Sequence, residues 1–258
     1  TRCWQIVGDL FPEYERARRL MAAEASAAIA GAFDAGASEV YVNDSHGGFR
    51  NMPPDLLDAR AQAIQGKPRY LSMVAGVELG VDGLVCIGYH ARSKGRGILA
   101  HTINSFAFAR VRFNGQELGE LGIYGLLAGQ YGVPVIAASG DDAFIAEYRA
   151  LLPATRFIEV KRATGFGSGT SLSPEAACAA IRAGVAEAVP QARATAPLAM
   201  AGPIVVELQT QTPALADLFC QWPTLARTGG DALRFDAPDV ESAVRMLNCL
   251  SAMSSVLG

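Results

Sequence analysis

The chain of 258 residues contains only three histidines, and two of them follow the ends of predicted strands. His46 comes just after a strand predicted over residues 39–43, and His90 just after a strand predicted over 83–87. His101 follows a short way along the chain. Because ligands collect outside the carboxyl ends of strands in open α/β sheets, the imidazoles are expected in one region. Neutral imidazole is the commonest metal ligand in proteins, so this spacing is compatible with a metal site.

An ordinary structural role for these histidines has to be weighed against the metal site. A single histidine after a strand is more often a loop residue with no chemical function. No H-x-x-x-H or H-E-x-x-H motif is present to place two ligands on one helix face. From spacing alone, the two interpretations are about equally supported.

Carboxylates could supply the remaining ligands of such a site. Glu117 and Glu120 lie at the start of a predicted helix, where a negative charge also stabilises the positive end of the helix dipole. Glu120 lies between Gly119 and Gly122, and it would serve as a hard oxygen ligand if it faces the histidines. Asp44 precedes His46 by two residues, but its position is equally typical of an Asx turn.

The elements that position these residues alternate between helices and short apolar strands. Helices are predicted over 12–35, 118–131, 141–152, from 173 onwards and over 239–253, and strands over 39–43, 83–87, 106–113, 133–138 and 204–208. This order predicts an α/β fold with a mostly parallel sheet covered by helices on both faces. A stretch rich in Ala and Pro over 189–203 divides the chain. Residues 1–194 are predicted as the main domain, and 195–258 as a smaller C-terminal α/β extension or subdomain.

Composition excludes several classes of function. With 22 basic and 25 acidic residues and no basic stripe, the chain is not expected to bind nucleic acid. No apolar stretch reaches the roughly 20 residues of a membrane span. The 5 cysteines are scattered and the start of the chain has no apolar signal segment, so we expect a cytoplasmic protein with reduced thiols. Neither a phosphate-binding loop nor a G-x-S-x-G elbow is present; the glycines of 165–169 predict a flexible loop.

Four motifs occur together in the sequence: Val-Asn-Asp-Ser-His ending at His46, Gly-Tyr-His-Ala around His90, Ala-His-Thr around His101 and Gly-Glu-Leu-Gly around Glu120. Their order and separations resemble those of the zinc-dependent D-aminopeptidase family. Weaker similarity extends over 14–16, 72–74, 140–142 and 160–161. The resemblance covers most of residues 12–173 and is thinner afterwards.

This resemblance implies a function and a set of roles. The family has an α/β fold with a two-zinc site and removes N-terminal D-amino acids from short peptides. Carried over by motif, His46, His90 and Glu120 would be metal ligands, and His101 the catalytic group beside the metals. Residues 1–194 would form the catalytic metallopeptidase domain. The resemblance also implies a homo-oligomer, ring-shaped in the known member, that acts on small peptides.

One expected motif is absent from the sequence. The family takes an Asp and a Glu ligand from an Asp-x-Glu-Gly strand, which its layout would place just before Thr1, and Gly8-Asp9-Leu10 is not a substitute. The chain begins without Met, so we expect this motif on a preceding segment of the protein. The alternatives are a non-catalytic small-ligand binding protein with a degenerate metal site, or a metal-dependent hydrolase of other peptides or amides (L-, β- or modified). The sequence does not fix the substrate side chain, its stereochemistry, the metal or the subunit number.

Overall fold

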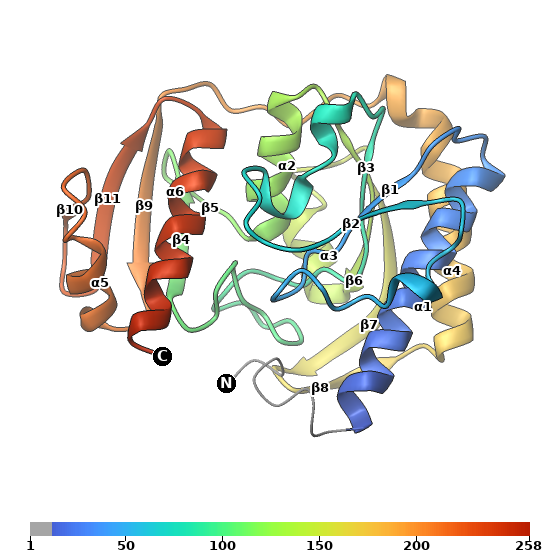
Figure 1. Ribbon diagram of the computed structural model, residues 1–258, viewed down its shortest axis with the longest axis horizontal. Helices are drawn as coiled ribbons and strands as arrows, with labels where there is room; N and C mark the ends of the chain where they lie inside the picture. The colour runs from blue at the N-terminus through green and yellow to red at the C-terminus, as the bar shows by residue number, and fades with distance from the viewer. Residues whose placement is uncertain (1–11) are drawn as a thin grey trace.

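The computed structural model describes residues 12–258 and shows an alternation of helices and strands (Figure 1). In chain order the elements are α1 (Pro12–Asp34), β1 (Tyr41–Asn43), β2 (Gln62–Ile64), β3 (Leu84–Cys86), β4 (Phe108–Phe113), β5 (Gln116–Glu117), α2 (Glu120–Gln130), β6 (Val135–Asp141), α3 (Asp142–Tyr148), β7 (Arg156–Gly165), β8 (Ser168–Ser171), α4 (Pro174–Ala188), β9 (Ile204–Thr210), α5 (Pro213–Phe219), β10 (Ala226–Arg227), β11 (Ala232–Ala237) and α6 (Val240–Met253). The start of the chain and residues 8–10, both considered in the sequence analysis, lie outside the described residues.

A four-stranded sheet of order β3-β6-β7-β8 has helices on both faces. Strands β3, β6 and β7 are parallel, and β8 returns antiparallel to β7. Neighbouring residues of β7 contact helices on opposite faces of the sheet, because successive strand side chains point in opposite directions. Ile158 packs with Ile181 and Val185 of α4, whereas Phe157 packs with Phe144 and Tyr148 of α3. The prediction of an α/β fold with helices on both faces is therefore confirmed.

Helices α1 and α4 lie side by side next to this sheet (Figure 1). Gly31 of α1 permits the close approach, because a Cβ atom there would clash with the backbone carbonyl of Arg182 in α4. Arg182 also pairs with Asp34 at the end of α1, with 2.6 Å between Nε and Oδ2. Helix α4 starts where Ser173 accepts a hydrogen bond from the amide of Ala176.

A second sheet, of order β10-β11-β9-β4-β5, is antiparallel throughout. Its buried face includes Phe108 and Phe113 of β4 and packs with α5 and α6, whose Phe219 and Leu247 are fully buried. The turn from β4 to β5 has positive φ at both Asn114 and Gly115. The Asn-Gly turn predicted from the sequence is confirmed.

The predicted domain division between residues 194 and 195 stays a prediction, and the antiparallel sheet crosses it. Strand β9 of the C-terminal segment pairs with β4, which belongs to the segment before the division, so both segments build one sheet. Within residues 12–258, no helix combines the length and apolar character needed to cross a membrane.

Strands β1 and β2 form a separate, parallel, two-stranded sheet. In the described part of the chain β1 pairs only with β2, and β3 only with β6. A cavity of about 1640 Å³ is lined by residues of both β1 and β3, together with residues of α1, α4 and α6. All three histidines and Glu120 line the same cavity.

Candidate metal centre

His90 and His101 lie on the long connection between β3 and β4, which contains neither helix nor strand over residues 87–107. The connection folds back so that the two imidazole rings stack, with ring centroids 3.9 Å apart and 25° between the planes. A buried hydrogen bond of 3.0 Å from the amide of Ser93 to Oγ1 of Thr102 joins the two ends of this fold. The structure thus brings His90 and His101 into direct contact, whereas the sequence predicted only that the imidazoles lie in one region.

Glu120 is the first residue of α2, and its side chain is 6% exposed. Its Oε2 lies 3.4 Å from Nε2 of His90, and its Oε1 lies 3.7 Å from Nε2 of His101. Oε1 also accepts a 2.8 Å hydrogen bond from the amide of Ile103, which fixes the carboxylate. One carboxylate therefore faces both imidazoles.

The hydrogen bonds of the imidazoles leave their Nε2 atoms free to bind a cation. Nδ1 of His90 lies 3.1 Å from the carbonyl of Ala91, and Nδ1 of His101 lies 2.8 Å from the carbonyl of Leu99. A carbonyl can only accept, so each Nδ1 carries the proton and each neutral ring presents an Nε2 lone pair. Metal-binding histidines are typically held in this way.

Three electron-pair donors therefore converge at one point, an arrangement that suits a cation between them. Burial lowers the pKa of His90, which favours the neutral ring. One ligand atom from each of His90, His101 and Glu120 lies within 4.8 Å of the other two. Two imidazole nitrogens and a carboxylate oxygen are a typical zinc donor set, so the residues present fit this metal.

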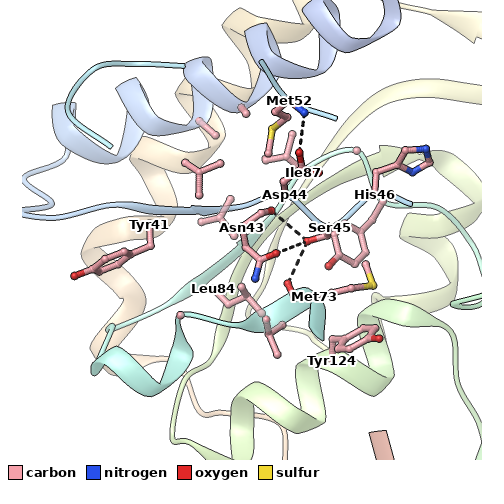
Figure 2. Close-up of a pocket in the computed structure, with 18 of the residues that line it drawn as sticks. Tyr41, Asn43, Asp44, Ser45, His46, Met52, Met73, Leu84, Ile87 and Tyr124 are labelled. Atoms are coloured by element: carbon pink, nitrogen blue, oxygen red, sulfur yellow. Dashed lines mark hydrogen bonds between the residues drawn. The ribbon is translucent and has the colours of Figure 1, made fainter. Parts of the chain in front are cut away.

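The structure places His46 near this group but not in it. His46 is exposed and lines the same cavity. Among residues 12–258, the side chains close enough to share one ion are those of His90, His101 and Glu120. The neighbouring Asp44 is fully buried: its Oδ2 accepts from the amide of Met52 at 2.7 Å (Figure 2). Its Oδ1 has no hydrogen-bond partner among the described residues.

Other residues of the strand end are fixed by hydrogen bonds. The hydroxyl of Ser45 lies within hydrogen-bond distance of the side chain and carbonyl of Asn43 and of the carbonyl of Met73 (Figure 2). Of the other carboxylates, Asp141 caps α3 by accepting from the amide of Phe144. Glu117 instead faces arginine side chains.

Sequence reasoning missed the contribution of α6 to the cavity. Asn248 and Ser251 of this helix line it, although they follow β3 by more than half of the chain. Asn104, three residues after His101, donates through Nδ2 to Oγ of Ser251 at 3.0 Å and so holds α6 against the loop. No local pattern in the sequence signals this contact, because it depends on the pairing of β9 with β4.

An α/β fold with two imidazoles and a buried carboxylate in its main cavity defines a candidate metal-dependent hydrolase. The family model of Peptidase_M55, described as D-aminopeptidase, matches residues 3–249, and the chain belongs to this family. The resemblance read from the four motifs is confirmed.

Two similar proteins extend this comparison. The D-aminopeptidase of Bacillus subtilis (strain 168) is 31% identical over 242 residues, which cover 93% of this chain and 88% of that protein. A solved structure, described as Zn-dependent D-aminopeptidase DppA from Bacillus subtilis, a self-compartmentalizing protease, matches with a TM-score of 0.92 and 28% identity. The match covers 98% of this chain and 92% of that chain.

Proposed function

We propose that the protein is a zinc-dependent aminopeptidase that removes the N-terminal D-amino acid from short peptides. The observation that carries the proposal is the convergence of His90, His101 and Glu120 in the main cavity of a chain of the D-aminopeptidase family. Both similar proteins are described as D-aminopeptidases, and one of them as Zn-dependent, which supports the choice of substrate and metal.

The proposed ligands are His46, His90 and Glu120, with His101 as the catalytic group. The chemistry that zinc supplies when bound is Lewis acidity and activation of a water near neutral pH. Glu120 would hold its share of the metal with a carboxylate already fixed by the amide of Ile103. Two zincs per subunit need more donors than this group offers, and the Asp-x-Glu-Gly carboxylates implied by the family stay a prediction.

His101 has the geometry of a proton carrier. The carbonyl of Leu99 holds the Nδ1 proton, so Nε2 can take a proton from the attacking water and return it to the leaving amine. Its side chain is 26% exposed, which leaves it accessible to a peptide in the cavity. General acid–base catalysis of this kind contributes about 10²–10⁴-fold in rate.

The position of His101 beside Glu120 makes it a competing candidate for the ligand role given to His46. Zinc content and turnover of single alanine variants separate the two assignments. We expect His90→Ala and His46→Ala to lose zinc, and His101→Ala to keep zinc and lose turnover. Loss of zinc from His101→Ala with full zinc in His46→Ala would exchange the two roles.

The activity itself is tested by the release of D-alanine from D-Ala-D-Ala, with L-Ala-L-Ala as the matched control. We expect zinc in stoichiometric amounts, and D-specific release that a chelator abolishes and added zinc restores. Release that is insensitive to the chelator, or equal with both substrates, would contradict the zinc dependence or the stereospecificity respectively.

We also propose a cytoplasmic homo-oligomer that encloses its active sites. The support is the description of the similar structure as a self-compartmentalizing protease. Light scattering on the purified protein measures the subunit number directly. A monomer with full activity would show that enclosure is unnecessary for function here.

A further inference from the structure

The connection that carries His90 and His101 is held by side-chain contacts instead of strand pairing. Over residues 87–107 it includes positive φ angles at Lys94 and Leu99, which a non-glycine residue adopts only when the surroundings impose them. The placement of the two imidazoles therefore depends on the groups that fix this connection.

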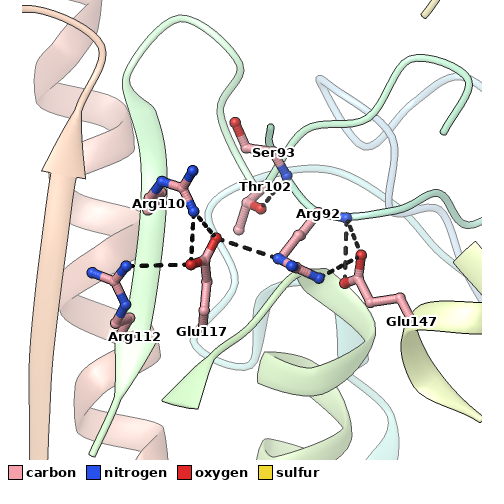
Figure 3. A network of polar contacts seen from close by, with 7 residues as sticks. All are labelled: Arg92, Ser93, Thr102, Arg110, Arg112, Glu117 and Glu147. Carbon is pink, nitrogen blue, oxygen red and sulfur yellow. Dashed lines mark hydrogen bonds and ion pairs between the residues drawn. The ribbon is translucent and has the colours of Figure 1, made fainter. Parts of the chain in front are cut away.

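Arg92, two residues after His90, bridges two separate elements. Its Nη1 lies 3.0 Å from Oε2 of Glu147 in α3, and its backbone amide donates to the same oxygen at 3.1 Å. Its Nε donates to Oε1 of Glu117 in β5 at 3.3 Å (Figure 3). Both carboxylates are mostly buried, with side chains 17% exposed for Glu117 and 11% for Glu147.

Glu117 is itself fixed from the other side by the antiparallel sheet. Nη1 of Arg110 lies 2.8 Å from both oxygens of Glu117, and Nη2 of Arg112 lies 3.3 Å from Oε2 (Figure 3). Both arginines project from β4. A carboxylate held by three guanidinium groups has little freedom to move, so it is a firm anchor for Arg92.

The backbone of Arg92 also lies directly against the residue that precedes Glu120. A Cβ atom on Gly119 would lie only 2.7 Å from Cβ and 3.0 Å from Cα of Arg92, so a glycine is required there. The segment that carries His90 and the segment that carries Glu120 thus meet twice, through this contact and through the Arg92–Glu117 ion pair.

We propose that Arg92 is a positioning residue of the metal centre. By bridging Glu117 and Glu147 it sets the separation of His90 from Glu120, which is 3.4 Å between Nε2 and Oε2. Metal affinity requires ligands held close to their binding geometry before the ion arrives, and residues that support the ligands typically affect affinity by about 10–100-fold. This inference rests on the proposed function.

The test compares zinc dissociation constants, measured by competition with a chromophoric chelator. Arg92→Gln should weaken zinc binding about 10–100-fold, and Arg92→Lys should fall between it and the native protein because a lysine keeps the charge and loses the forked geometry. The matched control is Arg156→Gln, which removes an exposed ion pair between Arg156 of β7 and Glu187 of α4 and should leave zinc affinity unchanged. An affinity of Arg92→Gln within twofold of this control would overturn the proposal.

Two measurements on the metal-free protein separate positioning from folding and from the proposed function. The melting temperature of Arg92→Gln should match that of Arg156→Gln; a much lower value would reassign Arg92 to general stability. Because the chain has three histidines, few ring signals appear in proton–carbon NMR spectra. The rings of His90 and His101 are stacked, so the ring current of each shifts the signals of the other. Arg92→Gln should shift these two signals more than that of His46.

The NMR result also decides the case in which the native protein binds no zinc. That outcome would reject the zinc-dependent function, while shifted His90 and His101 signals in Arg92→Gln would still support the positioning role. Unshifted signals would reject the positioning role whether or not the protein binds zinc.

Discussion

In the antiparallel sheet, β9 pairs with β4 on one side and with β11 on the other, and its Ile204, Val206 and Leu208 are buried. Helices α5 and α6 cover the strands with further apolar side chains. The positions of the residues in this sheet follow from strand register and from the burial of apolar surface. Each contact is weak and non-directional, and the sum stabilises the sheet.

The connection over 87–107 is fixed by different interactions. It has no strand register, and its conformation follows from directed polar contacts such as Ser93–Thr102, Ile98–Asp141 and Arg92–Glu147. Each polar contact fixes one position of the connection, and no neighbouring contact replaces it when it is lost. Substitutions in the sheet are therefore expected to change stability, and substitutions in the connection to change the metal centre.

The largest effect on the metal centre is expected from Glu120→Ala. The carboxylate faces both imidazoles, and its removal leaves two neutral nitrogens without the anion that completes the donor set. We expect loss of stoichiometric zinc, with activity at the level of the chelator-treated native protein. Elemental analysis after dialysis measures the zinc. Full zinc occupancy in this variant would move the metal centre away from Glu120.

A large effect on stability without an effect on zinc is expected from Phe219→Ala. Phe219 is fully buried and packs edge-on against Phe108, with ring centroids 6.3 Å apart. Removing its ring leaves a cavity in the core, which lowers the unfolding free energy by about 3–5 kcal/mol. Denaturant titration measures the loss, and Val256→Ala, at a residue 74% exposed, is the control with a change below about 0.5 kcal/mol. A zinc affinity that falls together with stability would remove the contrast between the two regions.

Thr102→Val is expected to have an intermediate effect on stability and a clear effect on zinc affinity. The change keeps the shape of the side chain and leaves the buried amide of Ser93 without an acceptor, at a cost of about 1–3 kcal/mol. Zinc affinity should fall more than in Phe219→Ala although stability falls less. Thr195→Val, which removes an exposed hydroxyl bond to the carbonyl of Gln191, is the control. Unchanged zinc affinity in Thr102→Val would show that the connection keeps its shape without this tie.

The elements that the sequence predicted well are those with local signals. The helix predicted over 12–35 is α1, Pro12–Asp34, and the helix predicted over 239–253 is α6, Val240–Met253, which Asp239 caps. Both have apolar residues at helical spacing. Strand β7 was not predicted because exposed charged residues such as Glu159 and Lys161 interrupt its apolar residues. The glycines at 165–169, predicted as a flexible loop, belong to the β7–β8 hairpin: Gly165 ends β7, Gly169 lies in β8, and Gly167 lies in the turn between them.

The candidate site shows the same division between local and non-local information. The order of strands and motifs was enough to propose that His90 and Glu120 lie near each other. The stacking of His101 on His90 was not predicted, because it depends on Thr102 meeting Ser93 and on positive φ angles at Lys94 and Leu99. Arg92 had no signal in the sequence, since its partners Glu117 and Glu147 come from two later elements.

The smallest effect is expected at an exposed polar contact that serves neither region. Asp58 accepts from Nε, Nη2 and the amide of Arg60, and these hydrogen bonds lower the pKa of its carboxyl to about 2 from 3.8. A carboxyl with a lowered folded pKa stabilises the protein above its unfolded pKa and loses that contribution as pH falls through the folded value. The difference in melting temperature between the native protein and Arg60→Gln should therefore be small and constant down to about pH 5, then shrink towards about pH 2. Asp58→Asn should show a similar loss at neutral pH without the acid dependence. A difference that persists at the acid end would mean that Arg60 acts through its contact with the ring of Phe33 in α1, 4.3 Å from the guanidinium carbon, and not through the carboxylate.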